Sequence, residues 1–414
     1  MINKKTKILF YYDTKYSKSL FCDIAGKLSN SLLISHKSIK SIKGIRLECS
    51  EIINDIENDY ARYVRFKYDT PNFSIWAIIK KWQRLGFSEN SLQRKYRRFL
   101  IKKKFQKWVN FFQNSNFNIV AGWCPIKPKR NIVFEAARFC KKSLLFFEDS
   151  PIPGFIICDH KGINGGLSFQ KDINFYINNV GNKASKINID LNQLFDGITQ
   201  RSPISKKYKL KKNEPKYLKK NIIYCPLQVQ DDTQIVKYGS WVNSVQKFIK
   251  LMHEASRFLP GNWQLVIREH PSCRISFSKK LIELSDDKFS VNNYIDSTQL
   301  IKLSKAVVTI NSSVGFHSLL KNKPVIVCGD AFWGFEPIAH VARNKSELFD
   351  KFSNINFLKT DINAIEKYMH FLLNQKFIST NYANDAFEID SEGLEIIHNS
   401  ALKSYNYYSK IYRL

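Results

Sequence analysis

The chain has 414 residues, and its 65 Lys and Arg against 36 Asp and Glu give a net charge of +29. The hydrophobic content of 44% is enough for packed cores and excludes a wholly disordered protein. The length exceeds that of a typical domain and suits two domains. The excess of positive charge implies an anionic partner, which is a nucleic acid, an acidic membrane surface or an anionic substrate.

The cysteine pattern and the apolar runs bear on the compartment. The eight cysteines are scattered without a C-x-x-C pair, which argues against a zinc site and against a disulfide framework. The first residues, MINKKTKILFYYDTKY, lack the apolar region of a signal peptide. No stretch approaches the roughly 20 apolar residues of a membrane-spanning helix. We therefore expect a reduced, cytoplasmic protein.

The first predicted domain, residues 1–215, begins with a strand over residues 7–12. The apolar residues Leu20, Ile24 and Leu28 recur every four positions and predict an amphipathic helix behind that strand. A strand that is followed by a helix is typical of the start of an α/β domain.

A basic helical insertion is predicted at about residues 74–112 of this domain. Eight Lys or Arg lie between Arg94 and Lys107, interleaved with Tyr96, Phe99, Phe105 and Trp108. Such a helix can lie on an anionic membrane, where each Lys or Arg adds about 1 kcal/mol. It can equally be a solvated helix whose aromatic stripe packs on its own domain. The usual nucleic-acid recognition modules are absent, so we expect no nucleic acid as partner.

The next predicted strand pair ends in acidic residues. Residues 117–123 predict a strand and residues 132–140 a helix, after which LLFFED predicts a strand with Glu148 and Asp149 at its carboxyl end. Open α/β sheets place ligands and catalytic groups at this end of their strands.

The second predicted domain, residues 216–385, repeats this arrangement. Its first strand, residues 221–228, is followed by Asp231 and Asp232, and the strand in WQLVIREHP ends at Arg268 and His270. Residues 386–414 predict a closing C-terminal helix.

The segment VVTINSSVGFHSLLKNKPVIV predicts a strand, a tight turn, a helix and a second strand. The turn carries Ser312, Ser313 and Gly315 at the start of the helix. A helix N-terminus with free N–H groups is a ready site for a phosphate, to which serine hydroxyls can add donors. The two serines can equally serve only as helix caps. The pattern leaves both interpretations open.

Together these strand ends offer carboxylates on one side and hydrogen-bond donors for a phosphate on the other. Glycosyl transfer from a nucleotide sugar needs this combination, because a carboxylate handles the acceptor proton while cations and N–H groups stabilise the departing phosphate. No D-x-D motif or histidine cluster suggests a metal, and no G-x-G-x-x-G suggests a dinucleotide. We therefore expect neither a metal nor a cofactor.

Four segments resemble, in the same order, those of the bacterial β-Kdo transferases that build capsule and lipopolysaccharide O-antigen glycans. They are FFEDSPIPGFIICDHKGI, CPLQVQDDTQ, REHP and INSSVGFHSLLKNKPVIVCGDAFW, and the resemblance covers residues 123–333. One departure is that Ser150 to Pro153 stand between the acidic pair and Gly154, where the family has glycine directly after Glu-Asp. The resemblance implies an α/β GT-B-like fold, in which two Rossmann-like domains face each other across a cleft. It also implies CMP-β-Kdo as donor and retention of the β-anomer on a glycan acceptor, free or lipid-linked.

The resemblance also implies roles for individual residues. Asp232 is the expected nucleophile with Asp231 as the alternative, and either Glu148 or Asp149 faces the acceptor. The expected donor-binding residues are Arg268, His270, Ser312, Ser313 and Gly315. A lipid-linked acceptor implies an anionic membrane surface as partner, on the inner face of the inner membrane. The alternatives are a CMP-sialic acid transferase, which shares the acidic motif, the His-Pro and the serine pair, and a non-catalytic basic protein that binds anionic lipid or nucleic acid.

Overall fold

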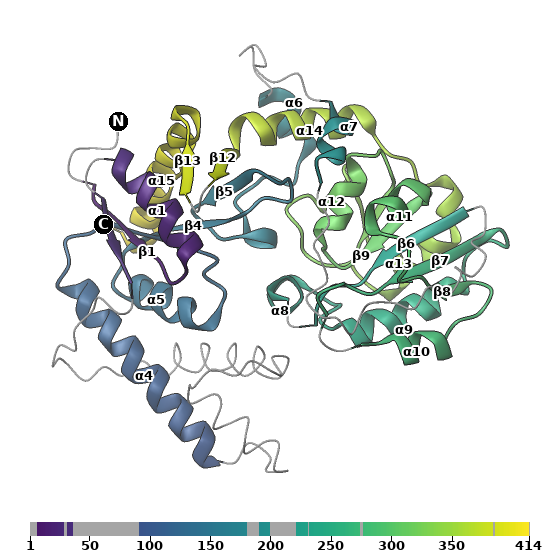
Figure 1. Ribbon diagram of the computed structural model, residues 1–414, viewed down its shortest axis with the longest axis horizontal. Helices are drawn as coiled ribbons and strands as arrows, with labels where there is room; N and C mark the ends of the chain where they lie inside the picture. The colour runs from purple at the N-terminus through teal and green to yellow at the C-terminus, as the bar shows by residue number, and fades with distance from the viewer. Residues whose placement is uncertain are drawn as a thin grey trace. The chain divides into compact units, whose positions relative to one another are not determined.

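The computed structural model describes residues 6–28, 31–35, 91–179, 190–198, 221–230, 232–273, 276–383 and 386–413. The chain divides into two compact α/β units, which Figure 1 shows in one view. Unit 1 comprises Met1–Glu148, Cys158–Gly162 and Thr380–Leu414, and unit 2 comprises Asp149–Ile157 and Ile163–Ser379. The predicted boundaries near residues 215 and 385 lie outside the described residues, and the chain passes between the units near residues 148 to 163 and again near residue 380.

A seven-stranded sheet lies mainly in unit 1. Its strands are β1 (Ile8–Tyr11), β2 (Ser31–Ile34), β3 (Ile119–Trp123), β4 (Ser143–Asp149), β5 (Phe155–Asp159), β12 (Phe377–Ala383) and β13 (Ala386–Ile389), in the order β13-β12-β5-β4-β3-β1-β2. β1 pairs in parallel with both β2 and β3, and β3 pairs in parallel with β4. The first five strands thus have the flavodoxin-like order, whose topological switch point lies between β1 and β3.

In the part of unit 1 that the structure describes, the helices are α1 (Lys15–Lys27), α4 (Ser91–Gln113), α5 (Pro128–Phe139) and α15 (Ser391–Tyr412). α1 starts at a capping box, in which Thr14 and Ser17 bond each other's backbone N–H groups. α5 starts at Pro128, four residues before the predicted start, because proline suits the first position of a helix. α15 is tied to β4 by Ser404, whose Oγ donates to the Leu144 carbonyl at 2.7 Å.

The basic helix α4 is packed into unit 1 along its C-terminal half only. Phe105 and Trp108 are 2% and 4% exposed, and the Trp108 ring lies 5.4 Å from the ring of Tyr11 on β1. Tyr96 and Phe99, six or more residues earlier in the helix, are 47% and 58% exposed. Two of these aromatic residues therefore belong to the core of unit 1, and two lie at its surface.

Unit 2 contains a six-stranded sheet in which every neighbouring pair is parallel. Its strands are β6 (Asn221–Pro226), β7 (Trp263–Arg268), β8 (Phe289–Val291), β9 (Ala306–Thr309), β10 (Val325–Val327) and β11 (His340–Val341), in the order β11-β10-β9-β6-β7-β8. This is the Rossmann order, with the switch point between β6 and β9. The prediction of two Rossmann-like domains is confirmed, and the cleft between them stays a prediction.

Helices cover both faces of this sheet. They are α6 (Ile173–Asn179), α7 (Leu191–Asp196), α8 (Thr233–Tyr238), α9 (Val245–Ser256), α10 (Ser278–Glu283), α11 (Ser297–Leu303), α12 (Ser313–Leu319), α13 (Lys345–Ser353) and α14 (Ile362–Gln375), with the short helices η1 (Asn164–Gly166) and η3 (Ile355–Phe357). Alternate residues of β6 enter different cores: Ile222 and Tyr224 join one cluster, Ile223 and Cys225 the other. Burial on both faces explains why this strand reads as a continuous apolar run.

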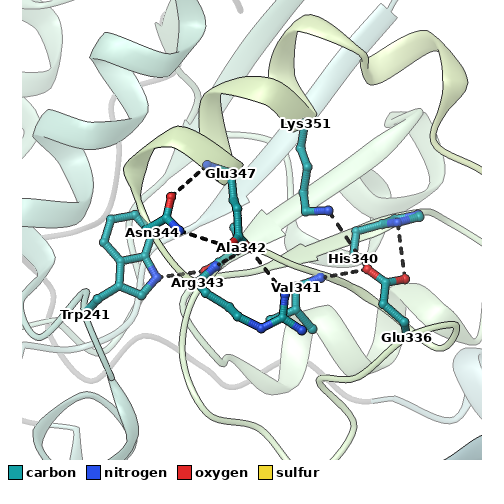
Figure 2. Close-up of polar contacts among 9 residues, drawn as sticks. All are labelled: Trp241, Glu336, His340, Val341, Ala342, Arg343, Asn344, Glu347 and Lys351. Carbon is teal, nitrogen blue, oxygen red and sulfur yellow. Dashed lines mark hydrogen bonds and ion pairs between the residues drawn. The ribbon is translucent and has the colours of Figure 1, made fainter.

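The edge of this sheet at β11 is short and well bonded (Figure 2). The Glu336 carboxylate accepts a hydrogen bond from Val341 N at 3.2 Å and lies 3.9 Å from Lys351 Nζ. Trp241 Nε1 donates to the Ala342 carbonyl at 2.8 Å and so ties the loop between α8 and α9 to the same edge. A two-residue edge strand surrounded by charged groups offers little surface for pairing with another chain.

An ion pair joins the elements at the switch point of unit 1. Arg130 Nε donates to Asp13 Oδ2 at 2.8 Å, and Arg130 Nη2 lies 2.8 Å from Asp13 Oδ1. Arg130 Nη1 donates to the Trp123 carbonyl at 2.9 Å. Arg130 is 4% exposed. Burial alone would lower the pKa of the Arg130 guanidinium, but the hydrogen bond and charge of Asp13 raise it above its ordinary value. The pair therefore links the ends of β1 and β3 to α5.

We predict that Arg130→Met destabilises the protein by about 3 kcal/mol, because it leaves the Asp13 carboxylate without its bidentate partner. Urea unfolding of the full chain measures the loss. Arg138→Met is the control on the same helix, since the Arg138–Glu135 pair is more exposed and such pairs contribute about 1 kcal/mol or less. Equal losses in the two variants would contradict a structural role specific to Arg130.

Candidate functional site

Two buried amide side chains join the loops at the switch point of unit 2. Asn311 follows β9 and Gln228 follows β6, and they are 3% and 5% exposed. Gln228 Nε2 donates to Asn311 Oδ1 at 3.0 Å. Asn311 Nδ2 donates to the carbonyl oxygens of Gln234, Tyr238 and Asp330, at 3.0, 2.8 and 3.2 Å respectively. One side chain thus connects α8 with the loops that follow β9 and β10.

The sequence analysis missed both amides. The available signal was their position, since each comes one or two residues after a buried strand at the edge where ligands bind.

The two serines differ in their surroundings. Ser312 is 9% exposed and caps α12, where its Oγ accepts a hydrogen bond from Val314 N at 3.2 Å. Ser313 is the first residue of α12 and is exposed. The capping interpretation therefore holds for Ser312. A hydroxyl that accepts one bond still has its own hydrogen to donate, so phosphate binding by both serines stays a prediction.

Gly315 has a packing function. It is buried, and a Cβ at this position would lie 2.4 Å from Trp333 Cη2 and 2.9 Å from Thr309 Cγ2. Any larger residue would push α12 away from the Trp333 ring. A contact between Gly315 and a ligand stays a prediction.

Asp232 and the residues around it occupy the loop after β6. Asp232 is half-buried and caps α8, with its Oδ1 accepting from Gln234 N at 2.9 Å. Asp231 lies outside the described residues. Gln230, at the same loop, is 8% exposed and donates to Gln246 Oε1 at 2.8 Å. The loop that carries the predicted nucleophile is therefore held to both α8 and α9.

Arg268 and His270 come from the end of β7, which pairs directly with β6. Arg268 Nε donates to the Ile295 carbonyl at 2.9 Å. His270 Nδ1 accepts from Ser272 N at 3.1 Å, so the neutral ring carries its proton on Nε2. Because β7, β6 and β9 are parallel neighbours, Arg268, His270, Asp232 and the serine pair all follow carboxyl ends at one sheet edge.

The acidic pair closes β4, and its two members have different surroundings. Glu148 is half-buried and groups with unit 1, whereas Asp149 is exposed and groups with unit 2. Burial raises the pKa of the Cys124 thiol well above its ordinary value, and the negative charge of Glu148 raises it further. Cys124 is therefore a protonated thiol at neutral pH and is unsuited to act as a nucleophile.

The turn after the acidic pair is docked onto α12 within unit 2. His317 Nε2 lies 2.8 Å from the Pro151 carbonyl oxygen. Ile152 is 3% exposed and belongs to the same core cluster as Phe316 and Leu319 of α12. Ser150 Oγ closes the turn by donating to the Ile152 carbonyl at 2.7 Å. The extra residues between Glu-Asp and Gly154 therefore pack against the helix that carries the predicted phosphate site.

Within the residues that the structure describes, no group of three or more His, Cys, Asp or Glu is placed to hold a metal ion. The helices described here include none with the length and apolar character needed to cross a membrane.

The two Rossmann-like units, with polar groups at a switch-point edge, define an α/β protein of the kind that binds ligands at the carboxyl ends of its strands. Residues 198–353, which include the whole of the unit 2 sheet, match the family described as Capsule polysaccharide biosynthesis protein. The matched segment is less than half of the chain, and the resemblance to proteins of capsule synthesis is confirmed.

Individual relatives share part of the chain. Protein FixF of Sinorhizobium fredii is 27% identical over 272 residues, which are 63% of each chain. Capsule polysaccharide export protein KpsS of Escherichia coli is 31% identical over 157 residues, which are 34% of this chain and 40% of that protein. The chain thus spans less than two thirds of the length of these curated relatives. Among solved structures, the β-Kdo 2,7 transferase of Thermosulfurimonas dismutans KpsC has a TM-score of 0.45 and 16% identity, over 80% of this chain and 98% of that chain.

Proposed function

We propose that the protein is a retaining glycosyltransferase that moves β-Kdo from CMP-β-Kdo to a glycan acceptor during synthesis of capsule or O-antigen. The observation that carries this proposal is the edge of the unit 2 sheet, where Asp232, Arg268, His270 and the serine pair follow the ends of three adjacent parallel strands. These residues lie within the segment that matches the capsule polysaccharide biosynthesis family.

In this proposal, unit 2 holds the donor. Arg268 supplies positive charge and N–H donors to the CMP phosphate, His270 supplies its Nε2–H, and Ser312 and Ser313 supply hydroxyl donors. These groups stabilise the negative charge that grows on the phosphate as it departs. Kdo itself bears a carboxylate at its anomeric carbon, so the donor is anionic at two places, which suits a protein of net charge +29.

Retention is proposed to follow from two displacements. The Asp232 carboxylate forms a bond to the anomeric carbon while the bond from that carbon to the phosphate oxygen breaks, and CMP leaves with the electron pair. The acceptor hydroxyl then attacks the same carbon, and Asp232 regains its electron pair. Glu148 or Asp149 takes the acceptor proton.

The donor assignment is tested with a panel of nucleotides. We expect CMP and CTP to raise the Tm and UMP and GMP to leave it unchanged, since a ligand at roughly 100 times its Kd stabilises the native state by about 2.7 kcal/mol. His270→Ala and Ser313→Ala should each lower turnover of CMP-Kdo, on the order of 100- to 1000-fold. Ser353→Ala, a change at the exposed end of α13, is the control and should have no effect.

Three outcomes would contradict this assignment. Turnover with CMP-sialic acid but not with CMP-Kdo would indicate the other transferase class. Salt-dependent binding of DNA or RNA without binding of CMP would indicate a non-catalytic protein. Near-normal turnover in both His270→Ala and Ser313→Ala would exclude these residues from the phosphate site.

The nucleophile is tested by intact-protein mass spectrometry after incubation with CMP-Kdo. We expect a Kdo adduct on the wild type and on Asp231→Asn, and none on Asp232→Asn. Asn caps helices about as well as Asp, so Asp232→Asn should keep the cap of α8 and fold normally. An adduct on Asp232→Asn would exclude Asp232, and retention without an adduct in any variant would favour a front-face mechanism.

We further propose that the N-terminal half of α4 lies on the anionic inner leaflet, where a lipid-linked acceptor is held. Tyr96 and Phe99 are exposed there beside exposed lysines, and the residues of α4 include no Asp or Glu. Figure 1 shows α4 as a single long helix of unit 1. This assigns the protein a peripheral place on the cytoplasmic face of the inner membrane.

Liposome sedimentation tests this surface. Lys102→Gln with Lys103→Gln should weaken binding to anionic vesicles by about 2 kcal/mol, or roughly 30-fold, because each lysine contributes about 1 kcal/mol. The matched control is Lys403→Gln with Lys410→Gln, which removes the same charge from exposed positions on α15. Binding that ignores lipid charge and salt would contradict the proposal.

A further inference from the structure

Glu269 is a buried carboxylate in the loop that carries the predicted phosphate ligands. It stands between Arg268 and His270 and is 5% exposed. Removing a carboxylate from water costs several kcal/mol unless its oxygens are bonded to other groups. The hydrogen bonds of the Glu269 carboxylate therefore indicate its role in this loop.

The carboxylate bonds to two separate segments. From the start of α10 it accepts hydrogen bonds from Phe277 N and from the hydroxyls of Ser276 and Ser278. From the loop after β8 it accepts a hydrogen bond from Asn293 Nδ2 at 2.8 Å. Glu269 N also donates to Asn293 Oδ1 at 2.8 Å, so the two residues bond each other twice.

The same loop after β8 also holds the neighbour of Glu269. Arg268 Nε donates to the Ile295 carbonyl at 2.9 Å. Asn292 Oδ1 accepts from Tyr294 N and Ile295 N, each at 3.0 Å, and so fixes the shape of this loop. Two consecutive residues at the end of β7 are thus anchored to one rigid turn.

We propose that Glu269 is the positioning residue of the donor site. It fixes the backbone on both sides of itself and so sets the directions in which Arg268 and His270 project from the end of β7. This inference rests on the proposed function, because it assigns these two residues to the phosphate of the donor. A shift of about 1 Å in such groups is enough to cost on the order of 100-fold in rate.

The alternative is that Glu269 contributes only to stability. The two roles predict different outcomes in a double-mutant cycle, because residues that act through each other show non-additive effects. Glu269→Gln keeps the size of the side chain. It replaces one acceptor oxygen with an NH2 group, which cannot accept the bonds that this oxygen received. Those bonds come from Phe277 N and Ser276 at Oε1, or from Ser278 and Asn293 at Oε2.

The experiment measures the Kd of CMP by calorimetry in wild type, Glu269→Gln, His270→Ala and the double variant. We expect Glu269→Gln to weaken CMP binding about 10-fold, with the double variant no weaker than His270→Ala alone. Asp286→Asn is the matched control. Its carboxylate accepts from Lys288 N and Phe289 N at 2.8 Å in the loop before β8, at the opposite end of the strand. It should leave the Kd of CMP unchanged.

A second measurement does not depend on CMP. We expect the His270 ring signals in NMR spectra to shift and broaden in Glu269→Gln and to stay sharp in Asp286→Asn. If Glu269→Gln fails to fold, Asn293→Ala removes one partner of the carboxylate and should give a smaller change in the same direction.

The outcomes test the proposed function and the positioning role of Glu269 separately. A wild type that does not bind CMP contradicts the proposed function, and the ring signals of His270 still decide whether Glu269 positions it. A lower Tm in Glu269→Gln with unchanged CMP affinity and unchanged ring signals overturns the positioning role. Additive losses of affinity in the double variant overturn it as well.

Discussion

The edge of unit 2 depends on the amide of Asn311. A Rossmann sheet ends its parallel strands in loops whose carbonyl groups lie close together, and each buried carbonyl without a donor costs about 1–3 kcal/mol. The Asn311 side chain donates to the carbonyls of Gln234 and Tyr238 in α8 and of Asp330 after β10, and accepts from Gln228, a residue 83 positions away. The loops that carry Asp232 and the serine pair take their positions from this one side chain. Its loss would alter all of them together.

Much of this framework follows from the sequence, because buried parallel strands read as apolar runs and their carboxyl ends are easy to find. The ends of β6, β7 and β9 were therefore predictable, and so were the polar residues that follow them. The Asn311–Gln228 pair was not, since an amide after a strand gives no indication of a partner so far along the chain. The burial of the aromatic residues of α4 was not predictable either, for another reason. Helical periodicity shows that Phe105 and Tyr96 share a helix, but not which turns a neighbouring element covers.

The turn after the acidic pair shows how a departure from a family pattern can be accommodated. The inserted residues form a closed turn through Ser150, bury Ile152 in the core beside α12, and present the Pro151 carbonyl to His317. An insertion that gains a buried side chain and a hydrogen bond is held in a defined place, so Asp149 leads into a fixed segment of unit 2. Glu148, one residue earlier, groups with unit 1, where its negative charge raises the pKa of the Cys124 thiol. Adjacent residues of a strand point to opposite faces, so the two carboxylates are suited to different tasks.

The two switch points are held by different chemistry with the same electrostatic result. In unit 1 the connection is the Asp13–Arg130 ion pair, and in unit 2 it is a pair of neutral amides. Neither adds net charge, so the local field at each edge is set by the other groups there. In unit 2 the buried carboxylate of Glu269 is bonded by backbone, hydroxyl and amide donors, which disperse its charge without using Arg268. The Arg268 guanidinium is therefore not paired with Glu269. It is left to attract the anionic sugar nucleotide that is proposed to bind at this edge.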